Sequence, residues 1–325
     1  MKCYFRFLGV LVLLAPCIAL AHTRWFAEAP LPPVPQNEPT ALYLSVWAVV
    51  VVGAGILAYY FDRHSILQLN FLHLGRDHAF ERAAATFSMV AGAFFVVAAT
   101  HGYLFAPVLT QEAGVPQFLL TVELLAGIML LTGVYSRIGA LVILSLSAWL
   151  ASSLSLLTAL EHAWVVGAAL FIGIMGSDYF TLVPMPTLAH MTHRFRPWAL
   201  PLLRVGAGAT LLTLGFSEKI LDPALGLDFL AQHQWNFMAL LGLPYSDYLF
   251  VLSAGAVESL LGSLLILGLC TRLVALTTLG IFAIPMFLMG PLELTGHLPH
   301  LAALVLLVFF SGGNRMNLVV RRTRG

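Results

Sequence analysis

The chain alternates between long apolar segments and short polar connections. Nine apolar segments follow residue 39, and each is close to the ~20 residues that a helix needs to cross a bilayer. They lie at about 40–61, 83–105, 117–135, 138–157, 162–177, 199–217, 247–269, 273–290 and 298–312. The pattern predicts an all-α membrane protein with about nine transmembrane helices.

The composition is typical of a chain embedded in a lipid bilayer. Hydrophobic residues make up 60% of it and charged residues only 10%, and the mean hydropathy is +0.91. A soluble domain carries about 25% charged residues, so this chain lacks the polar side chains that cover a surface in water. The net charge of +1, with basic residues scattered along the chain, does not indicate a nucleic-acid partner.

The first 21 residues resemble a secretory signal peptide. Lys2 and Arg6 precede an apolar stretch at 7–14, and Ala19-Leu20-Ala21 fits an A-x-A cleavage site. Cleavage there makes His22 the mature N-terminus and leaves a proline-rich outer segment, 22–39. An uncleaved membrane anchor is the alternative interpretation.

Arginine gathers in the short loops on one side of the predicted helices. That side holds Arg63, Arg76, Arg82, Arg137, Arg194, Arg196, Arg272, Arg315, Arg321, Arg322 and Arg324, whereas the other side holds only Arg24 and Lys219. Cytoplasmic loops carry the excess of basic residues. The sequence therefore predicts a membrane protein with its N-terminus on the outer side and a cytoplasmic basic tail, 315–325.

Part of the chain occurs twice. Residues 122–148 align with 257–283 at a shift of 135 without a gap, and 11 of the 27 positions are identical. The identical pairs include Glu123 with Glu258, Gly127 with Gly262, Gly133 with Gly268 and Arg137 with Arg272. We expect a leading helix at 40–61 and two tandem four-helix units of parallel topology, 82–178 and 199–314.

The duplicated glutamates are the first candidates for chemistry. Each lies 14 residues before an arginine at the inner helix end, which places it roughly 21 Å from that end. A carboxylate in a membrane helix costs about 2.5–3.5 kcal/mol or more unless it is protonated, paired or facing a polar cavity. Glu123 and Glu258 are thus candidate proton-accepting groups, and a structural role bonded to a neighbouring helix is the alternative.

Histidines gather at the outer ends of the predicted helices. His162 and His297 are related by the same shift of 135 and open the last helix of each unit, and His300 lies one turn after His297. Two clusters follow: His22, His101, Glu123, Glu161 and His162 in the first unit, and Glu218, Lys219, Glu258, His297 and His300 in the second. Within them we expect catalytic roles for Glu123, Glu258, His162 and His297 and cofactor-binding roles for His300, His101, Glu218 and Lys219.

A metal site is a separate hypothesis for the outer side. A mature N-terminal His22 offers an amine and an imidazole to one ion, and His101 or His162 supplies a third nitrogen. Imidazole suits copper and zinc, so copper is one cofactor candidate and quinone is the other. The alternative for each histidine is an ordinary interfacial side chain.

Several stretches resemble the DoxX/DoxD family of membrane proteins. They are LLRVGAGATLLTLGFSEKILDP (202–223), AVESLLGSLLILGLCTRLVAL (256–276) and the opening HTRWF (22–26), whereas ATHGY (99–103) replaces the GFSEK-like end in the first unit. The resemblance implies a bacterial inner-membrane protein associated with respiratory or sulfur redox chemistry such as thiosulfate:quinone oxidoreduction. It transfers no active site, because the family has no well-defined shared catalytic residues.

The sequence favours a membrane subunit of a quinone- or sulfur-linked redox system, with electrons supplied by a periplasmic or membrane partner. Nucleotide-binding and esterase motifs are absent. A proton-coupled transporter of small solutes and a non-catalytic metal-handling or assembly protein are the alternatives.

Overall fold

The computed structural model describes residues 34, 40–75, 77–177, 179–181, 189–289, 291–313 and 315–319. Within these ranges the chain is helical and forms no β-strand. The expected signal peptide, His22 and the end of the basic tail lie outside them, so those expectations remain predictions.

Each apolar segment of the sequence forms a helix. The long helices are α2 (Thr40–Arg63), α3 (Asp77–Thr100), α4 (Gln117–Thr132), α5 (Ser136–Ser153), α7 (Ala163–Met175), α8 (Ala189–Gly215), α11 (Asp247–Leu267), α12 (Thr271–Met289) and α13 (Pro291–Phe310). Shorter helices are η2 (Asn70–Leu72), α6 (Leu156–Glu161), the π-helical turn η4 (Phe216–Leu221), α9 (Ala224–His233) and α10 (Phe237–Leu240).

Five of these helices are long and apolar enough to cross a membrane: α2, α3, α5, α8 with η4, and α11. The helices α4 and α7, and the described parts of α12 and α13, are apolar but shorter, at 10–17 residues. An α-helical membrane protein is therefore supported at the level of the fold class.

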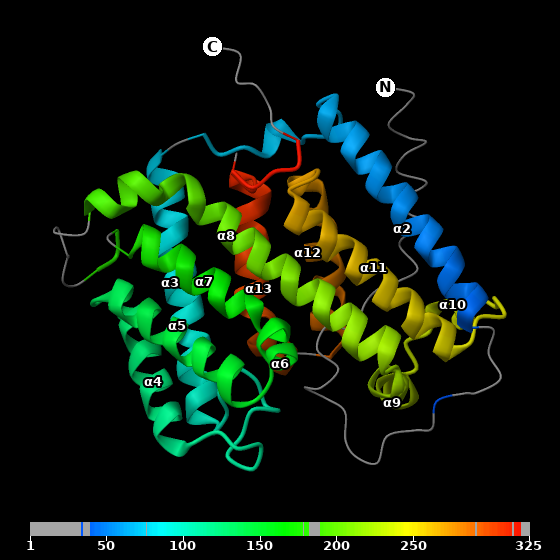
Figure 1. Cartoon of the computed structure of the whole chain (residues 1–325), viewed down its shortest axis with the longest axis horizontal. Coiled ribbons are helices and arrows are strands. Elements are labelled where there is room, and N and C mark those ends of the chain that lie inside the picture. The colour runs from blue at the N-terminus through cyan, green and yellow to red at the C-terminus, as the bar shows by residue number, and fades with distance from the viewer. Residues whose placement is uncertain are drawn as a thin grey trace.

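The two halves of the chain pack their helices in the same pattern (Figure 1). In the first half α3 packs on α4, α4 on α5, and α5 on α7; in the second, α8 packs on α11, α11 on α12, and α12 on α13. The contacts between the halves are also equivalent, because α7 packs on α8 and α13 packs on α3. Such an arrangement is what a pseudo-two-fold axis between two similar units produces.

Glycines set the same close helix crossing in each half. A Cβ on Gly127 would lie 2.9 Å from the backbone nitrogen of Val96, and a Cβ on Gly262 would lie 2.5 Å from that of Leu212. Both glycines also face a glycine carbonyl, Gly92 in one half and Gly208 in the other. Small residues let helix backbones approach closely in membranes, so the repeated glycines bring α3 against α4 and α8 against α11.

The loop between η4 and α11 contains two short helices. Instead of one continuous helix the chain forms α9, which ends at Gln234 in the left-handed conformation (φ 52°), and the short α10. The side chain of Asn236 accepts a hydrogen bond from Ala239 and donates to the Tyr245 carbonyl and to Asp247. These bonds satisfy the broken backbone and fold the loop against the start of α11.

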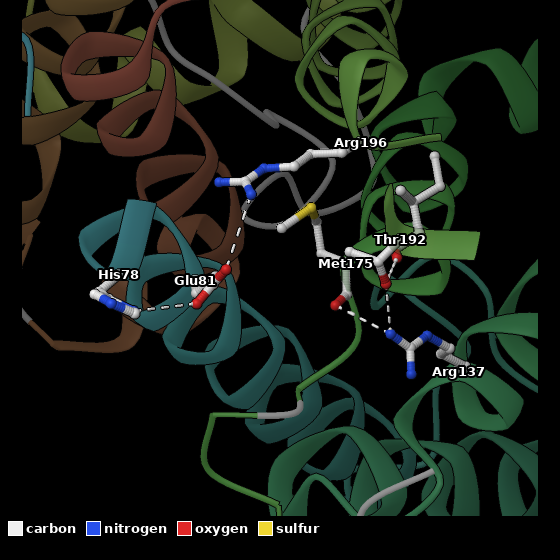
Figure 2. Close-up of polar contacts among 7 residues, drawn as sticks. His78, Glu81, Arg137, Met175, Thr192 and Arg196 are labelled. Atoms are coloured by element: carbon white, nitrogen blue, oxygen red, sulfur yellow. Dashed lines mark hydrogen bonds and ion pairs between the residues drawn. The ribbon is translucent and has the colours of Figure 1, made fainter. Parts of the chain in front are cut away.

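The two duplicated arginines, Arg137 and Arg272, are buried. Arg137 is buried and donates hydrogen bonds to the Met175 carbonyl at the end of α7 and to Thr192 near the start of α8 (Figure 2). Arg272, also buried, donates to the Gln68 carbonyl and to Asn70, just before α3. Each arginine thus fixes the segment that enters the other half of the molecule.

Candidate functional site

A buried ion pair forms the centre of the candidate site. The Lys219 ammonium on η4 lies 2.7 Å from Oε2 of Glu258 on α11, and both side chains are almost fully buried, with 0% and 3% of their surface exposed. The other oxygen of Glu258, Oε1, accepts no hydrogen bond within the described part of the chain. The pair therefore neutralises two charges in the bundle and leaves one carboxylate oxygen as an acceptor.

Local sequence places the two charges face to face. The end of α8 widens into a π-helical turn, a feature that often occurs at functional sites. Glycine at 255 makes room for the lysine stem, because a Cβ there would lie 2.8 Å from the Cβ of Lys219. Gly215 does the same for Glu258, whose Cβ would lie 2.9 Å from an added methyl group.

Further ionisable side chains of the second half surround this pair. Glu218 and His297 lie within electrostatic range of Glu258, and His300 lies within range of His297. All three are buried, and the His297 ring contacts Phe282 with 5.6 Å between centroids. The structure therefore brings together the second cluster expected from the sequence.

The first half contributes to the same cluster, so members of the two candidate clusters lie side by side. Ser217 beside the ion pair donates a 3.1 Å hydrogen bond to Glu161 of α6. His162 interacts electrostatically with His300, and the ring of the adjacent Trp164 lies 4.7 Å from that of His300. The reason is that α7 packs on α8 across the boundary between the halves, which brings the start of α7 to the end of α8.

Glu123 occupies a different environment from its duplicate. It is fully buried, and its Oε1 accepts a 3.2 Å hydrogen bond from the backbone N–H of Phe105 in the loop after α3. Its Oε2 accepts no hydrogen bond from any residue that the structure describes. Gly92 and Gly208 occupy equivalent positions at the glycine crossings of the two halves. Tyr103 lies 11 residues after Gly92, and Lys219 lies 11 residues after Gly208, so Tyr103 is the equivalent of Lys219 in the first half.

The tyrosine in this position is neutral. Burial and, to a smaller extent, the Glu123 carboxyl raise the pKa of Tyr103 above its ordinary value of 10.0. A phenol cannot compensate the charge of a buried carboxylate as an ammonium does. We infer that the first half contains an uncharged version of the ion-pair position.

Of the three histidines predicted as metal ligands, His101 and His162 lie among the residues that the structure describes, and His22 lies outside them. His101 is exposed at the end of α3, and its Nδ1 donates to the Val97 carbonyl, 2.9 Å away. Nδ1 of His162 donates to the Thr158 carbonyl at 2.8 Å. No group of three His, Cys, Asp or Glu side chains among the described residues is arranged to hold a metal; the copper hypothesis depends on His22 and remains a prediction.

Sequence reasoning missed a buried arginine at the far end of the bundle. Arg204 on α8 has no exposed surface and donates hydrogen bonds to Asn317 and to the Met316 carbonyl, so it holds the chain that follows α13. Asp62 lies within electrostatic range of it. An arginine inside the apolar segment 199–217 was the signal, since such residues are rarely without a partner.

Comparisons with known proteins add no relative. No family model, no curated protein and no solved structure matches the chain.

Proposed function

We propose that this chain is the DoxX-like membrane subunit of a redox system, in which the cluster around Lys219 and Glu258 exchanges protons with a redox carrier. The observation that carries the proposal is the buried ion pair with two histidines inside an apolar bundle. Ionisable groups at membrane depth are costly and mark proton relays or substrate sites. Six buried ionisable side chains gather here: Glu161, Glu218, Lys219, Glu258, His297 and His300.

The proposed arrangement in the membrane has nine spans. A leading helix, α2, precedes two four-helix units of parallel topology, α3–α7 and α8–α13, and a cleaved signal peptide leaves His22 outside. The arginine-rich helix ends face the cytoplasm of a bacterium under the positive-inside rule. The shorter helices α4 and α7 are accommodated because they pack between longer helices, which also bring the ion-pair cluster into the outer half of the bilayer.

The proposed chemistry assigns the protons to this chain and the electrons to a partner. Reduction of a quinone to a quinol takes two electrons and two protons. The electrons come from the redox centre of a periplasmic or membrane partner protein. Glu258, whose carboxylate Lys219 holds in place, and His297 each take up a proton from the aqueous phase and pass it to the quinone, and Glu123 and His162 act in the first half.

The test is quinone reduction by membranes of cells that carry the chain and its natural partners, with thiosulfate as the electron donor. Glu258→Gln keeps the size of the side chain and removes its charge, so we expect at least about a tenfold loss of rate, equivalent to about 1.4 kcal/mol. Glu112→Gln, in an exposed loop, is the matched control and leaves the rate unchanged. Full activity of the Glu258→Gln protein, inserted at the normal level, contradicts the proposal.

Transport is the second candidate, because duplicated units with intramembrane carboxylates are also a transporter feature. Proteoliposomes containing only this chain distinguish the two. A solute flux that follows an imposed proton gradient and disappears in Glu258→Gln identifies a transporter, whereas a redox subunit without its partner carries no flux.

A further inference from the structure

An apolar groove runs along the surface of the bundle beside the ion-pair cluster. It has a volume of about 430 Å³ and is lined by α5, α7 and α8, with Leu144 and Ala148 on one wall and Val205 and Ala209 on the other. Ligand sites in proteins have volumes of about 300–1,000 Å³. The groove is therefore large enough for part of a small molecule.

The groove exists because α7 and α8 touch through glycine. A Cβ on Gly206 would lie 2.8 Å from both the Ala163 carbonyl and the Cα of Gly167. The backbones of α7 and α8 meet there. Small residues such as Ala151, Gly167 and Ala209 line the groove together with larger ones such as Leu170. Ala148 on α5, which also lines it, is exposed.

One end of the groove reaches the ion-pair cluster. His162 lines the groove and interacts electrostatically with His300. The neighbouring Glu161 accepts the hydrogen bond from Ser217, two residues before Lys219. A molecule lying in the groove therefore has its chain against apolar helix surface and its end next to buried ionisable groups.

We propose that this groove holds the hydrocarbon tail of the redox carrier, which enters the cluster sideways from the lipid with its head at His162. The inference rests on the proposed function and adds the place in this chain where the tail of the quinone carrier, whose head is neutral, lies. The apolar lining excludes a water-soluble sulfur species as the occupant. The buried carboxyl groups Glu161 and Glu218 beside the head position disfavour an anionic head such as a lipid phosphate.

The experiment measures binding of decylubiquinone to the purified full chain in phosphatidylcholine nanodiscs by quenching of tryptophan fluorescence. The ring of Trp164 lies 4.7 Å from that of His300, so Trp164→Phe identifies its share of the signal. We expect saturable binding, and at least about tenfold weaker binding of the same benzoquinone ring with a methyl group in place of the tail. Equal binding of the tailless ring overturns the proposal.

Two substitutions in the groove, compared with one control outside it, test whether the tail lies there. Ala148→Phe fills it from an exposed position and should raise the Kd of decylubiquinone about tenfold or more. Ala41→Phe adds the same bulk to an exposed position of α2, outside the groove, and should leave the Kd unchanged. Ala209→Leu narrows the groove from α8 and provides an independent second variant. Unchanged affinity in both groove variants, or displacement of the quinone by an equal concentration of dodecyl phosphate, contradicts the assignment.

This binding test needs no electron transfer, so it separates the two proposals. Tail-dependent binding that Ala148→Phe weakens, together with full turnover of Glu258→Gln, supports the groove and overturns the proposed proton role. Loss of turnover in Glu258→Gln with tail-independent binding supports the proposed proton role and overturns the groove assignment.

Discussion

Lys219 and Glu258 form an ion pair, 2.7 Å from Nζ to Oε2, at the point where the π-helical turn η4 crosses α11. Each residue is the charge partner of the other in an environment that water does not reach. Glu161, His162, Glu218, His297 and His300 gather around this pair from both halves of the chain. The pair thus has a role both in the stability of the bundle and in the proposed proton exchange.

Removing one member of the pair should destabilise the protein more than removing both. Lys219→Met leaves the Glu258 carboxylate buried without its cation, which costs about 3–5 kcal/mol. In Lys219→Met/Glu258→Leu no charge remains, and most of this loss should be recovered. Unfolding of the detergent-solubilised variants measures both values, and a double variant as unstable as Lys219→Met contradicts the interpretation.

The glycine crossing of α8 and α11 makes a second prediction. In Gly262→Ala the new methyl group lies 2.5 Å from the Leu212 nitrogen and 2.6 Å from the Gly208 carbonyl oxygen. Both neighbours are backbone, so the helices must separate, at a cost of about 1–3 kcal/mol. The measurement is the midpoint of thermal unfolding of the purified protein.

Gly280→Ala is the matched control for this crossing. A Cβ on Gly280 of α12 meets no atom within 4 Å, and alanine is the better helix former by about 1 kcal/mol. We expect an unchanged or higher midpoint. Equal effects of the two substitutions would show that helix propensity, and not the close approach, decides the outcome.

Arg204 should hold the chain after α13 in place. Without its guanidinium in Arg204→Met, the Met316 carbonyl and Asn317 lose their donor, and the hydrogen bond from Leu318 N–H to the Leu267 carbonyl loses its support. Hydrogen exchange of residues 315–319 should then accelerate about tenfold or more. Asn317→Ala keeps the bond to the Met316 carbonyl, so its effect should be smaller.

Glu123 should tolerate replacement of its carboxyl group by an amide but not loss of its acceptor oxygen. Glu123→Gln retains a carbonyl oxygen for the Phe105 N–H, and the free energy of unfolding should change by about 0.5 kcal/mol or less. Glu123→Ala leaves that N–H buried without a partner and should cost about 1–3 kcal/mol. A Glu123→Gln protein as unstable as Glu123→Ala would mean that the carboxyl group has a charged partner.

Much of the fold could be predicted from the sequence because lipid imposes a simple requirement. Backbone groups in a bilayer must be satisfied within a helix, so each long apolar segment forms one. Regions outside the apolar segments were harder: α8 begins at Ala189, well before the predicted 199, although Pro197 and Pro201 lie inside it. The loop between η4 and α11 depends on the bonds of one side chain, Asn236, which no periodicity indicates.

The sequence predicts which residues belong to the candidate site, but not which of them lie next to one another. The duplication identifies Glu123 with Glu258 and His162 with His297, because costly residues repeated in register are unlikely to be accidental. The repeat also suggests two equivalent sites, one in each half. The structure has Lys219 beside one glutamate and Tyr103 near the other, so the two positions are chemically different.

By itself the sequence determined the helices, their apolar character and the residue types able to exchange protons, since these follow from composition and local pattern. Only the tertiary structure decided that Glu161 and His162 join the cluster of the other half, and that an apolar groove leads to it. The physical reason is that the crossing of α7 with α8 is set by the close approach of Gly167 and Gly206. Gly167 and Gly206 lie on different helices, 39 residues apart in the sequence, and neither helix alone indicates which helix it packs on.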